Sequence, residues 1–229
     1  MNPKKPRIMV GHGEGAFPKK SFEHAIRQKH SNISFNAVDI AEIRQDPLLR
    51  HLLFKIPHNL AIHQKTNSAV YLRTKADSSI HHQWSHFSSS AMPMYTRRNF
   101  YHEAFRTLVP GGKLVVIDGA MCEKEFVNEL QKVGFKVTSK RMSLQEIQKL
   151  GTEEALNTVV NISGILQNNE TIPKAKMKQI KQGWINLQLT KESKQTPEVV
   201  AQIERMADNV EKNLSDKPCT RIIATKPRK

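Results

Sequence analysis

The segment Lys113–Asp118, with the sequence KLVVID, constrains the fold more than any other part of the chain. Its four consecutive apolar residues point to both faces of a sheet, so both faces of this strand must be covered. Such strands are typical of parallel sheets that carry helices on both sides. The Pro-Gly-Gly triplet at 110–112 precedes it and ends a helix predicted from Asn99. The segment therefore predicts an inner strand that follows a helix.

Strand-length apolar runs alternate with segments of helical periodicity along much of the chain. Strands are predicted at 7–10, 33–38, 113–118, 135–138 and 220–225, and helices after Ser21, after Pro47, from Asn99 and at 126–133. Residues 60–62 and 69–72 are two further strand candidates, of which only one need join the main sheet, and 76–81 is a weak strand. This alternation predicts an α/β fold with a doubly wound, mostly parallel sheet.

Residues 143–215 break the alternation. Apolar residues recur at spacings of three and four over 156–162, 177–187 and 199–214, which predicts three successive helices. We therefore expect a Rossmann-like domain formed by residues 1–142 and 216–229. The helical insertion 143–215 would precede the last strand and serve as a cap or substrate subdomain.

The bulk composition favours a soluble cytoplasmic protein. No run approaches the roughly 18 apolar residues of a membrane-spanning helix, and the apolar stretch after Arg7 is too short for a signal peptide. The two cysteines, Cys122 and Cys219, are too few for a disulfide framework. We expect no membrane association, and the oligomeric state stays open.

The chain is strongly basic, with 36 Lys and Arg against 21 Asp and Glu and a net charge of +15. That balance is compatible with a nucleic-acid partner, and the lysines of 174–181 would then be the contact surface. The alternative is an ordinary solvated basic surface. The basic residues are scattered, and only 6% of residues are aromatic and able to stack on bases.

A glycine-rich turn follows the first predicted strand, in Gly11-His12-Gly13-Glu14-Gly15. Glycines allow a tight turn and a close approach to a ligand, and the following helix offers unpaired N–H groups at its positive end. Asp39 comes 24 residues after Gly15, at the end of the second strand, where a carboxylate accepts ribose hydroxyl protons. The pattern predicts a nucleotide-type ligand, and by itself it fits a dinucleotide as well. The plainer alternative is a solvated loop.

Several segments resemble the class I S-adenosylmethionine-dependent methyltransferases. Residues 10–15 are similar to the family's first motif, Val38-Asp39-Ile40 to its ribose-binding strand end, and 105–118 to its helix, Pro-Gly-Gly turn and fifth strand. Residues 222–226 resemble its seventh strand, which is antiparallel. The resemblance implies a seven-stranded sheet of methyltransferase type, with S-adenosylmethionine as the cofactor. It also implies cofactor contacts from Asp77 and Ser79, which precede the exit loop of the fourth strand.

The chain departs from the family pattern at several positions. Met9 stands where the family often has an acid, two residues before the first glycine. No Asn-Pro-Pro-Tyr or Asp-Pro-Pro-Tyr motif is present, which argues against methylation of adenine or cytosine amino groups. The methyl acceptor, small molecule or macromolecule, stays unidentified.

Three histidines near the fourth strand, His81, His82 and His86, are candidates for a general base because imidazole titrates near neutral pH. His82 and His86 also have the i, i+4 spacing of a helical metal site, but no third ligand is evident, so no metal is predicted. Histidines at a strand exit are also commonly hydrogen-bonded loop residues. The sequence thus predicts a methyltransferase. The alternatives are a non-catalytic methyltransferase-like binding protein and a basic RNA-binding methyltransferase.

Overall fold

The computed structural model describes residues 7–12, 33–38, 60–63, 66–86, 88–143, 146, 174–213 and 219–228. The elements in chain order are β1 (Arg7–His12), β2 (Ile33–Val38), β3 (Leu60–His63), α3 (Ser68–Arg73), β4 (Ile80–His86), α4 (Met94–Thr107), β5 (Leu108–Gly119), the 3-10 helix η2 (Ala120–Cys122), α5 (Glu123–Val133), β6 (Lys136–Met142), α8 (Lys174–Lys191), α9 (Pro197–Asn213) and β7 (Cys219–Thr225). The helices predicted after Ser21, after Pro47 and at 156–162 lie outside the described residues.

These strands form one sheet in the order β3-β2-β1-β4-β5-β7-β6. Neighbours from β3 to β5 are parallel, whereas β7 is antiparallel to both β5 and β6. Strand β6 ends at Met142 and β7 begins at Cys219, and these two residues are partners in the register. The chain therefore leaves β6 and enters β7 at the same end of the sheet, so β7 is antiparallel to its neighbours. The predicted α/β class and the mostly parallel sheet are confirmed.

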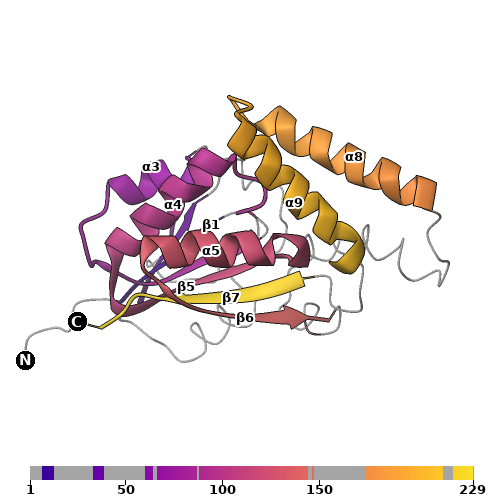
Figure 1. The fold of residues 1–229 in the computed structure, drawn as a ribbon. Helices are drawn as coiled ribbons and strands as arrows, with labels where there is room; N and C mark the ends of the chain where they lie inside the picture. The colour runs from indigo at the N-terminus through magenta and orange to yellow at the C-terminus, as the bar shows by residue number, and fades with distance from the viewer. Residues whose placement is uncertain are drawn as a thin grey trace, which may run out of the picture.

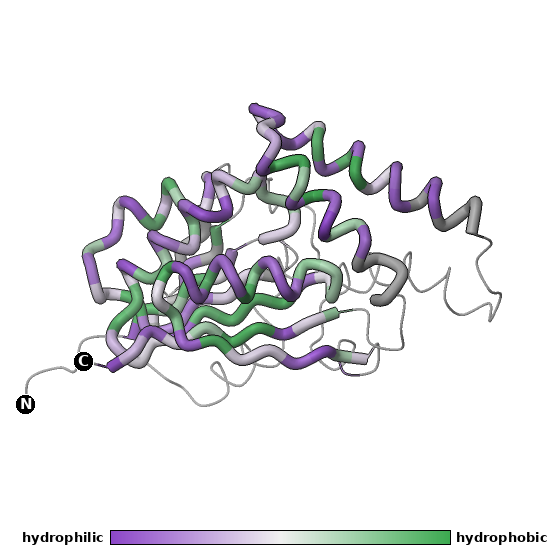
Figure 2. The backbone as a smooth tube through the Cα atoms, viewed as in Figure 1, coloured by the Kyte–Doolittle hydropathy of each residue, from purple (hydrophilic) through white to green (hydrophobic). Residues whose placement is uncertain are grey.

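Helices α3, α4 and α5 cover one face of the sheet (Figure 1). Leu114 and Val116 of β5 and Ile222 of β7 are fully buried in the same cluster as Phe100 and Phe126 of these helices. Figure 2 shows hydrophobic residues concentrated along the central strands and alternating with hydrophilic ones along α5. Burial of this apolar surface, at about 25 cal/mol per Å², is the main stabilising contribution to the core.

Strand candidate 60–62 joins the sheet as β3, and the alternative at 69–72 is wrong because it belongs to helix α3. Asn67 starts that helix, and its side-chain oxygen accepts a hydrogen bond from the Ala69 N–H at 2.8 Å. Tyr71 and Leu72 are buried against the main core. Burial of one helical face overrides the strand propensity of these residues.

Two other element boundaries differ from the prediction. Helix α4 begins at Met94, five residues before Asn99, and its added first turn carries Arg97 on the buried face. Strand β4 begins at Ile80 and runs to His86, beyond the weak strand predicted at 76–81. Both segments bury polar side chains whose partners are far away in sequence, so hydrophobic periodicity does not reveal them.

Two glycines adopt the left-handed backbone conformation, and one of them marks the end of a helix as predicted. Gly134 caps α5 in the left-handed region, at φ +109°. Gly111, at φ +81°, lies within the longer strand β5, where its N–H donates to the carbonyl of Lys226 at 2.9 Å. Helix α4 ends at Thr107, three residues before the Pro-Gly-Gly triplet, which lies inside the first residues of β5.

Helices α8 and α9 cover the segments 177–187 and 199–213 and confirm two of the predicted insertion helices. Val199 and Ile203 of α9 pack with Met94 of α4, and Met206 joins the main core. Figure 1 shows α9 beside α5, with α8 outside it, and α9 also contacts η2. None of the helices among the described residues has the length and apolarity that crossing a bilayer requires.

A buried ion pair joins α4 to α5 and also accepts a hydrogen bond from α9. Arg97 of α4 donates to both carboxylate oxygens of Glu129 on α5, at 2.8 and 2.9 Å. Gln202 of α9 donates to the same carboxylate at 2.9 Å. Burial opposes ionisation of Glu129, but the hydrogen bonds and positive charge of Arg97 outweigh it and lower the pKa of this carboxyl. Three helices therefore meet at one carboxylate.

We expect Glu129→Gln to destabilise the fold by about 3 kcal/mol, because it leaves the buried Arg97 guanidinium without its counter-ion. Urea unfolding at neutral pH measures the loss. The control is Lys140→Gln, which removes an exposed ion pair with Glu146 and should cost less than about 0.5 kcal/mol. Equal effects of the two substitutions would contradict the role given to the buried pair.

Candidate functional site

The exits of β1, β2 and β4 lie side by side at the carboxyl edge of the sheet. His12, the last residue of β1, pairs with Val38 of β2 and Ser85 of β4. Ligands of open α/β sheets bind in the crevice outside these strand ends. A ligand at this edge would meet the polar groups that follow these strands.

Serine hydroxyls cluster where β4 ends. The Ser85 hydroxyl lies 2.8 Å from the hydroxyls of both Ser88 and Ser89. Ser88 also donates to the carbonyl of His12 at 3.3 Å. The loop after β4 is thereby attached to the exit of β1.

The predicted glycine turn starts later than the sequence indicated. Gly11 and His12 belong to strand β1, where Gly11 pairs with Ala37 and Trp84. Gly13, Glu14 and Gly15 follow the strand and lie outside the described residues, as do Asp39 and Ile40, which follow β2.

The ring of His12 is completely buried beneath α4. Its Nε2 lies 3.3 Å from Oε1 of Gln83, and its ring meets Phe100 edge to face at 4.8 Å. The Gln83 amide nitrogen donates to the Thr107 hydroxyl at 3.0 Å, which orients the amide oxygen toward His12. Nε2 therefore carries the proton, and Nδ1 has no hydrogen-bond partner among the described residues. Burial lowers the pKa of His12 to about 3, although the Gln83 hydrogen bond opposes the shift.

Asp118 is the buried acid at the carboxyl end of β5. One carboxylate oxygen accepts from the Ser90 N–H at 3.0 Å and the other from the Gly119 N–H at 2.9 Å. Burial raises the pKa of Asp118, and the hydrogen bonds from Ser90 and Gly119 oppose the rise. The acid thus holds the loop after β4 against the end of β5.

Lys191, in the last turn of α8, is near enough to Asp118 for the two charges to interact. Burial lowers the pKa of Lys191, and the negative charge of Asp118 opposes that shift. Burial also raises the pKa values of the Cys122 and Cys219 thiols, which therefore stay neutral at physiological pH. Lys191 of α8 and Asp118 of β5 thus lie near each other, close to the carboxyl end of β5.

The sequence did not single out Ser88 or Asp118. Asp118 carried a signal, because it directly follows an apolar inner strand, where side chains reach the carboxyl edge. Ser88 carried none, since a polar loop of this composition is common.

The three candidate histidines do not form one site. His81, near the amino end of β4, accepts the Ile8 N–H at its Nδ1, 3.2 Å away. His82 stacks on Trp84 at 5.9 Å, and burial, followed by the positive charges of Lys113, His81 and Arg7, lowers its pKa. His86 is the last residue of β4, and its side chain lies outside what the structure describes. The helical metal spacing of His82 and His86 is wrong because both lie on a strand, where residues i and i+4 are about 13 Å apart. No cluster of three metal-ligating side chains occurs in the described parts of the chain.

Asp77 and Ser79 lie at the opposite edge from the strand exits. Both precede Ile80, the first residue of β4, and so stand at the amino ends of the parallel strands. Exposed Asp77 pairs with Arg106, and the Ser79 hydroxyl donates to the carbonyl of Ala76 at 2.6 Å. The strand predicted at 76–81 began four residues before the observed β4. Asp77 and Ser79 therefore lie at the amino end of β4 and not near its carboxyl end. We leave both out of the candidate site.

We expect the protein to lose stability as the pH is lowered, because protonation of His12 favours the unfolded chain. Below pH 6.5 its imidazole is protonated in the unfolded chain but stays neutral in the fold down to about pH 3. Stability is therefore full above pH 6.5 and is lost on acidification by about 1.4 kcal/mol per pH unit. Urea unfolding at pH 7, 6, 5 and 4 measures this slope. His12→Gln, which does not titrate, should lose stability less steeply, and parallel slopes would contradict the assignment.

We expect Asp118→Ala to cost about 2 kcal/mol, because it leaves the Ser90 and Gly119 N–H groups without their acceptor. Thermal and urea unfolding report the loss. Asp208→Ala, on the exposed face of α9, is the matched control and should change stability by less than about 0.5 kcal/mol. An equally stable Asp118→Ala variant would show that the acid does not hold the loop.

No protein-family model matches the sequence, and no curated protein matches it either. Solved structures are similar to the fold. Phosphoethanolamine N-methyltransferase 2 of Haemonchus contortus, in complex with S-adenosylmethionine, aligns with 99% of this chain at 14% identity and a TM-score of 0.50. An S-adenosylmethionine-dependent methyltransferase of Archaeoglobus fulgidus aligns with 97% at 13% identity and a TM-score of 0.51. The [4+2]-cyclase SpnF aligns with 98% at 12% identity and a TM-score of 0.53.

The chain spans 50% of the Haemonchus protein, 87% of the Archaeoglobus protein and 76% of SpnF. The similarity extends over nearly the whole chain, while the identities are low, so it concerns the fold. The chain has the fold of the class I S-adenosylmethionine-dependent methyltransferases.

Proposed function

We propose that the protein is an S-adenosylmethionine-dependent methyltransferase. The observation that carries the proposal is the register of His12 with Val38 and Ser85, which brings three strand exits together. The glycines follow the first exit, and Asp39 follows the second. A ligand with both a charged amino-acid end and a ribose needs polar groups from adjacent strand exits.

In this proposal the cofactor lies against Gly11, His12, Gly13, Glu14, Gly15, Asp39 and Ile40. Asp39 accepts the ribose hydroxyl protons, and backbone groups of the glycine turn contact the amino-acid end. His12 takes part through its backbone, since its ring is packed between Phe100 and Gln83. The bound cofactor supplies a methyl group activated on a sulfonium. The hydroxyl cluster of Ser85, Ser88 and Ser89 fits such a ligand because it is polar and adjoins the exit of β1.

The methyl acceptor would bind between the carboxyl ends of β4 and β5 and the helical insertion. Residues 143–215 are then a cap over a main domain formed by 1–142 and 216–229. Asp118 and Lys191 support this location, since the insertion approaches the sheet there. Of the three histidines, His86 stands at the carboxyl end of β4 and is our candidate for the proton acceptor.

We expect isothermal titration to detect binding of S-adenosylmethionine and S-adenosylhomocysteine. Asp39→Ala should weaken binding by about 1–3 kcal/mol, or roughly 5- to 150-fold, through lost hydrogen bonds to the ribose. The control is Asp77→Ala, which removes an acid at the opposite edge of the sheet and should leave affinity unchanged.

Failure of the wild-type protein to bind either compound would sink this proposal. Binding of both without methyl transfer to any acceptor would favour the non-catalytic binding protein instead. Met9 favours this second candidate function, because it is half-buried in β1 at the position where the family often has an acid.

A further inference from the structure

Five exposed basic residues form a strip at the amino edge of the sheet and along β6. This basic strip consists of Arg7, Lys113, Lys136, Lys140 and Arg228. Lys113 of β5 and Lys136 of β6 both pair with Thr225 of the strand between them. Directly paired residues point to the same face, so the two lysines flank Thr225 about 10 Å apart.

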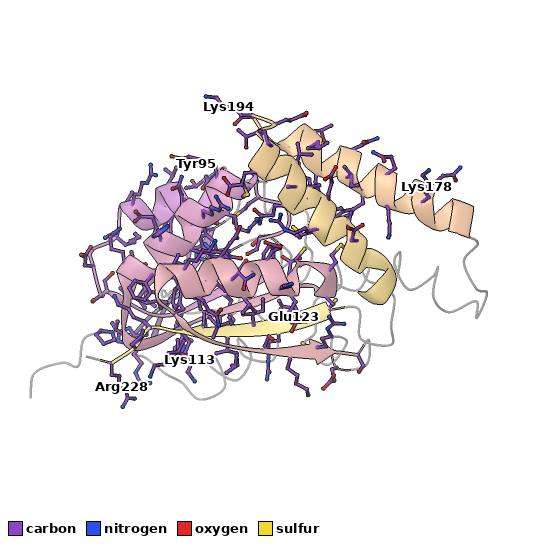
Figure 3. The ribbon with its side chains drawn as sticks, viewed as in Figure 1. Tyr95, Lys113, Glu123, Lys178, Lys194 and Arg228 are labelled. Atoms are coloured by element: carbon purple, nitrogen blue, oxygen red, sulfur yellow. The ribbon has the colours of Figure 1, made fainter. Side chains whose placement is uncertain are left out.

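The register places the rest of the strip on that face or next to it. Lys140 lies four residues after Lys136 on β6, which is about 13 Å farther on and on the same face. His82 pairs with both Met9 and Lys113, so Arg7, two residues before Met9, also shares this face. The Arg228 side chain lies over Gly111, with its Nε 3.0 Å from where a Cβ would stand. Figure 3 shows Lys113 and Arg228 emerging at the same end of the molecule.

Few acids balance this strip. Lys140 pairs with Glu146, whereas Arg7, Lys113, Lys136 and Arg228 form no ion pair with another described residue. Among the described residues the nearby acids Asp77 and Glu103 are both paired with Arg106. The strip therefore carries uncompensated positive charge on rigid strands.

The basic strip lacks large exposed hydrophobic side chains, and this indicates which kind of partner it can bind. The large hydrophobic side chains that are exposed among the described residues are Val70, Tyr95 and Leu187, on α3, α4 and α8. A protein interface needs a desolvated apolar centre, and a membrane-bound surface needs apolar side chains that insert. The strip has neither, whereas a chain of phosphates needs only fixed, repeated cations.

We propose that the basic strip binds the phosphodiester backbone of a nucleic acid. The bound strand crosses the amino edge near Lys113 and follows β6 from Lys136 to Lys140, toward the edge from which the insertion emerges. Contacts to phosphates carry no sequence information, so the surface anchors the nucleic acid without reading its bases. This surface differs from the lysines of 174–181 that the sequence indicated.

Fluorescence anisotropy with fluorescein-labelled 20-nucleotide RNA and DNA single strands tests the proposal on the full chain without cofactor. The decisive variant is Lys113→Glu/Lys136→Glu. The matched control, Lys178→Glu/Lys194→Glu, makes the same change in net charge at exposed positions away from the strip (Figure 3). We expect the strip variant to bind at least about tenfold more weakly at 100 mM salt. The dependence of log K on log salt should also become shallower by about 1.4–2. The control should lose less than about threefold.

Lys113→Gln/Lys136→Gln removes the two charges without reversing them. A loss of affinity in this variant that is smaller than in Lys113→Glu/Lys136→Glu supports the proposal. Binding of RNA alone, of DNA alone or of both supports it and identifies the source of the phosphates. Equal losses in the strip variant and the control would overturn it, as would no binding by the wild-type chain. Competition by poly-glutamate as strong as that by polyuridylate, at equal charge, would also overturn it. These outcomes are independent of whether the protein binds S-adenosylmethionine.

Discussion

Strand β5 is hydrogen-bonded on both sides, by parallel β4 and antiparallel β7, and the rest of the structure depends on this pairing. Its apolar residues Leu114 and Val116 lie in the core under α4 and α5. Because β7 fills the place beside β5, strand β6 is displaced to the edge of the sheet. The same arrangement returns both ends of the insertion to one edge, so α8 and α9 are held near the strand exits.

The carboxyl edge carries polar groups that a purely structural core would avoid. His12, Gln83 and Asp118 are all buried there, and each costs desolvation energy that its hydrogen bonds offset only in part. Neutral His12 and the raised pKa of Asp118 are direct consequences of that cost. Proteins accept local conflicts of this kind mostly at functional sites. The location of the conflict agrees with the proposed cofactor and acceptor sites.

The two edges of the sheet have opposite character. The carboxyl edge has buried polar groups and is approached by the insertion, whereas the amino edge and β6 expose cations. Arg106 illustrates how the amino edge is built, because it donates to the carbonyls of Leu72 and Lys75 and pairs with Asp77 and Glu103. The acids of this edge serve the packing of α3 against α4. In the basic strip beside them only Lys140 is paired with an acid among the described residues, which makes the strip available to a polyanion.

The sequence by itself determined the elements whose signal is local. Apolar runs defined β2 and the core of β5, and Gly134 marked the end of α5, because one residue type at one position decides such features. The tertiary structure decided what depends on distant partners. The segment 69–72 is a helix because its face is buried, and β4 is long because Gln83 and Ser85 find partners on α4 and in the following loop. The early boundary predicted for β4 also put Asp77 and Ser79 at the wrong edge. Burial of polar groups is a property of the whole fold, so no local pattern of hydrophobicity contains it.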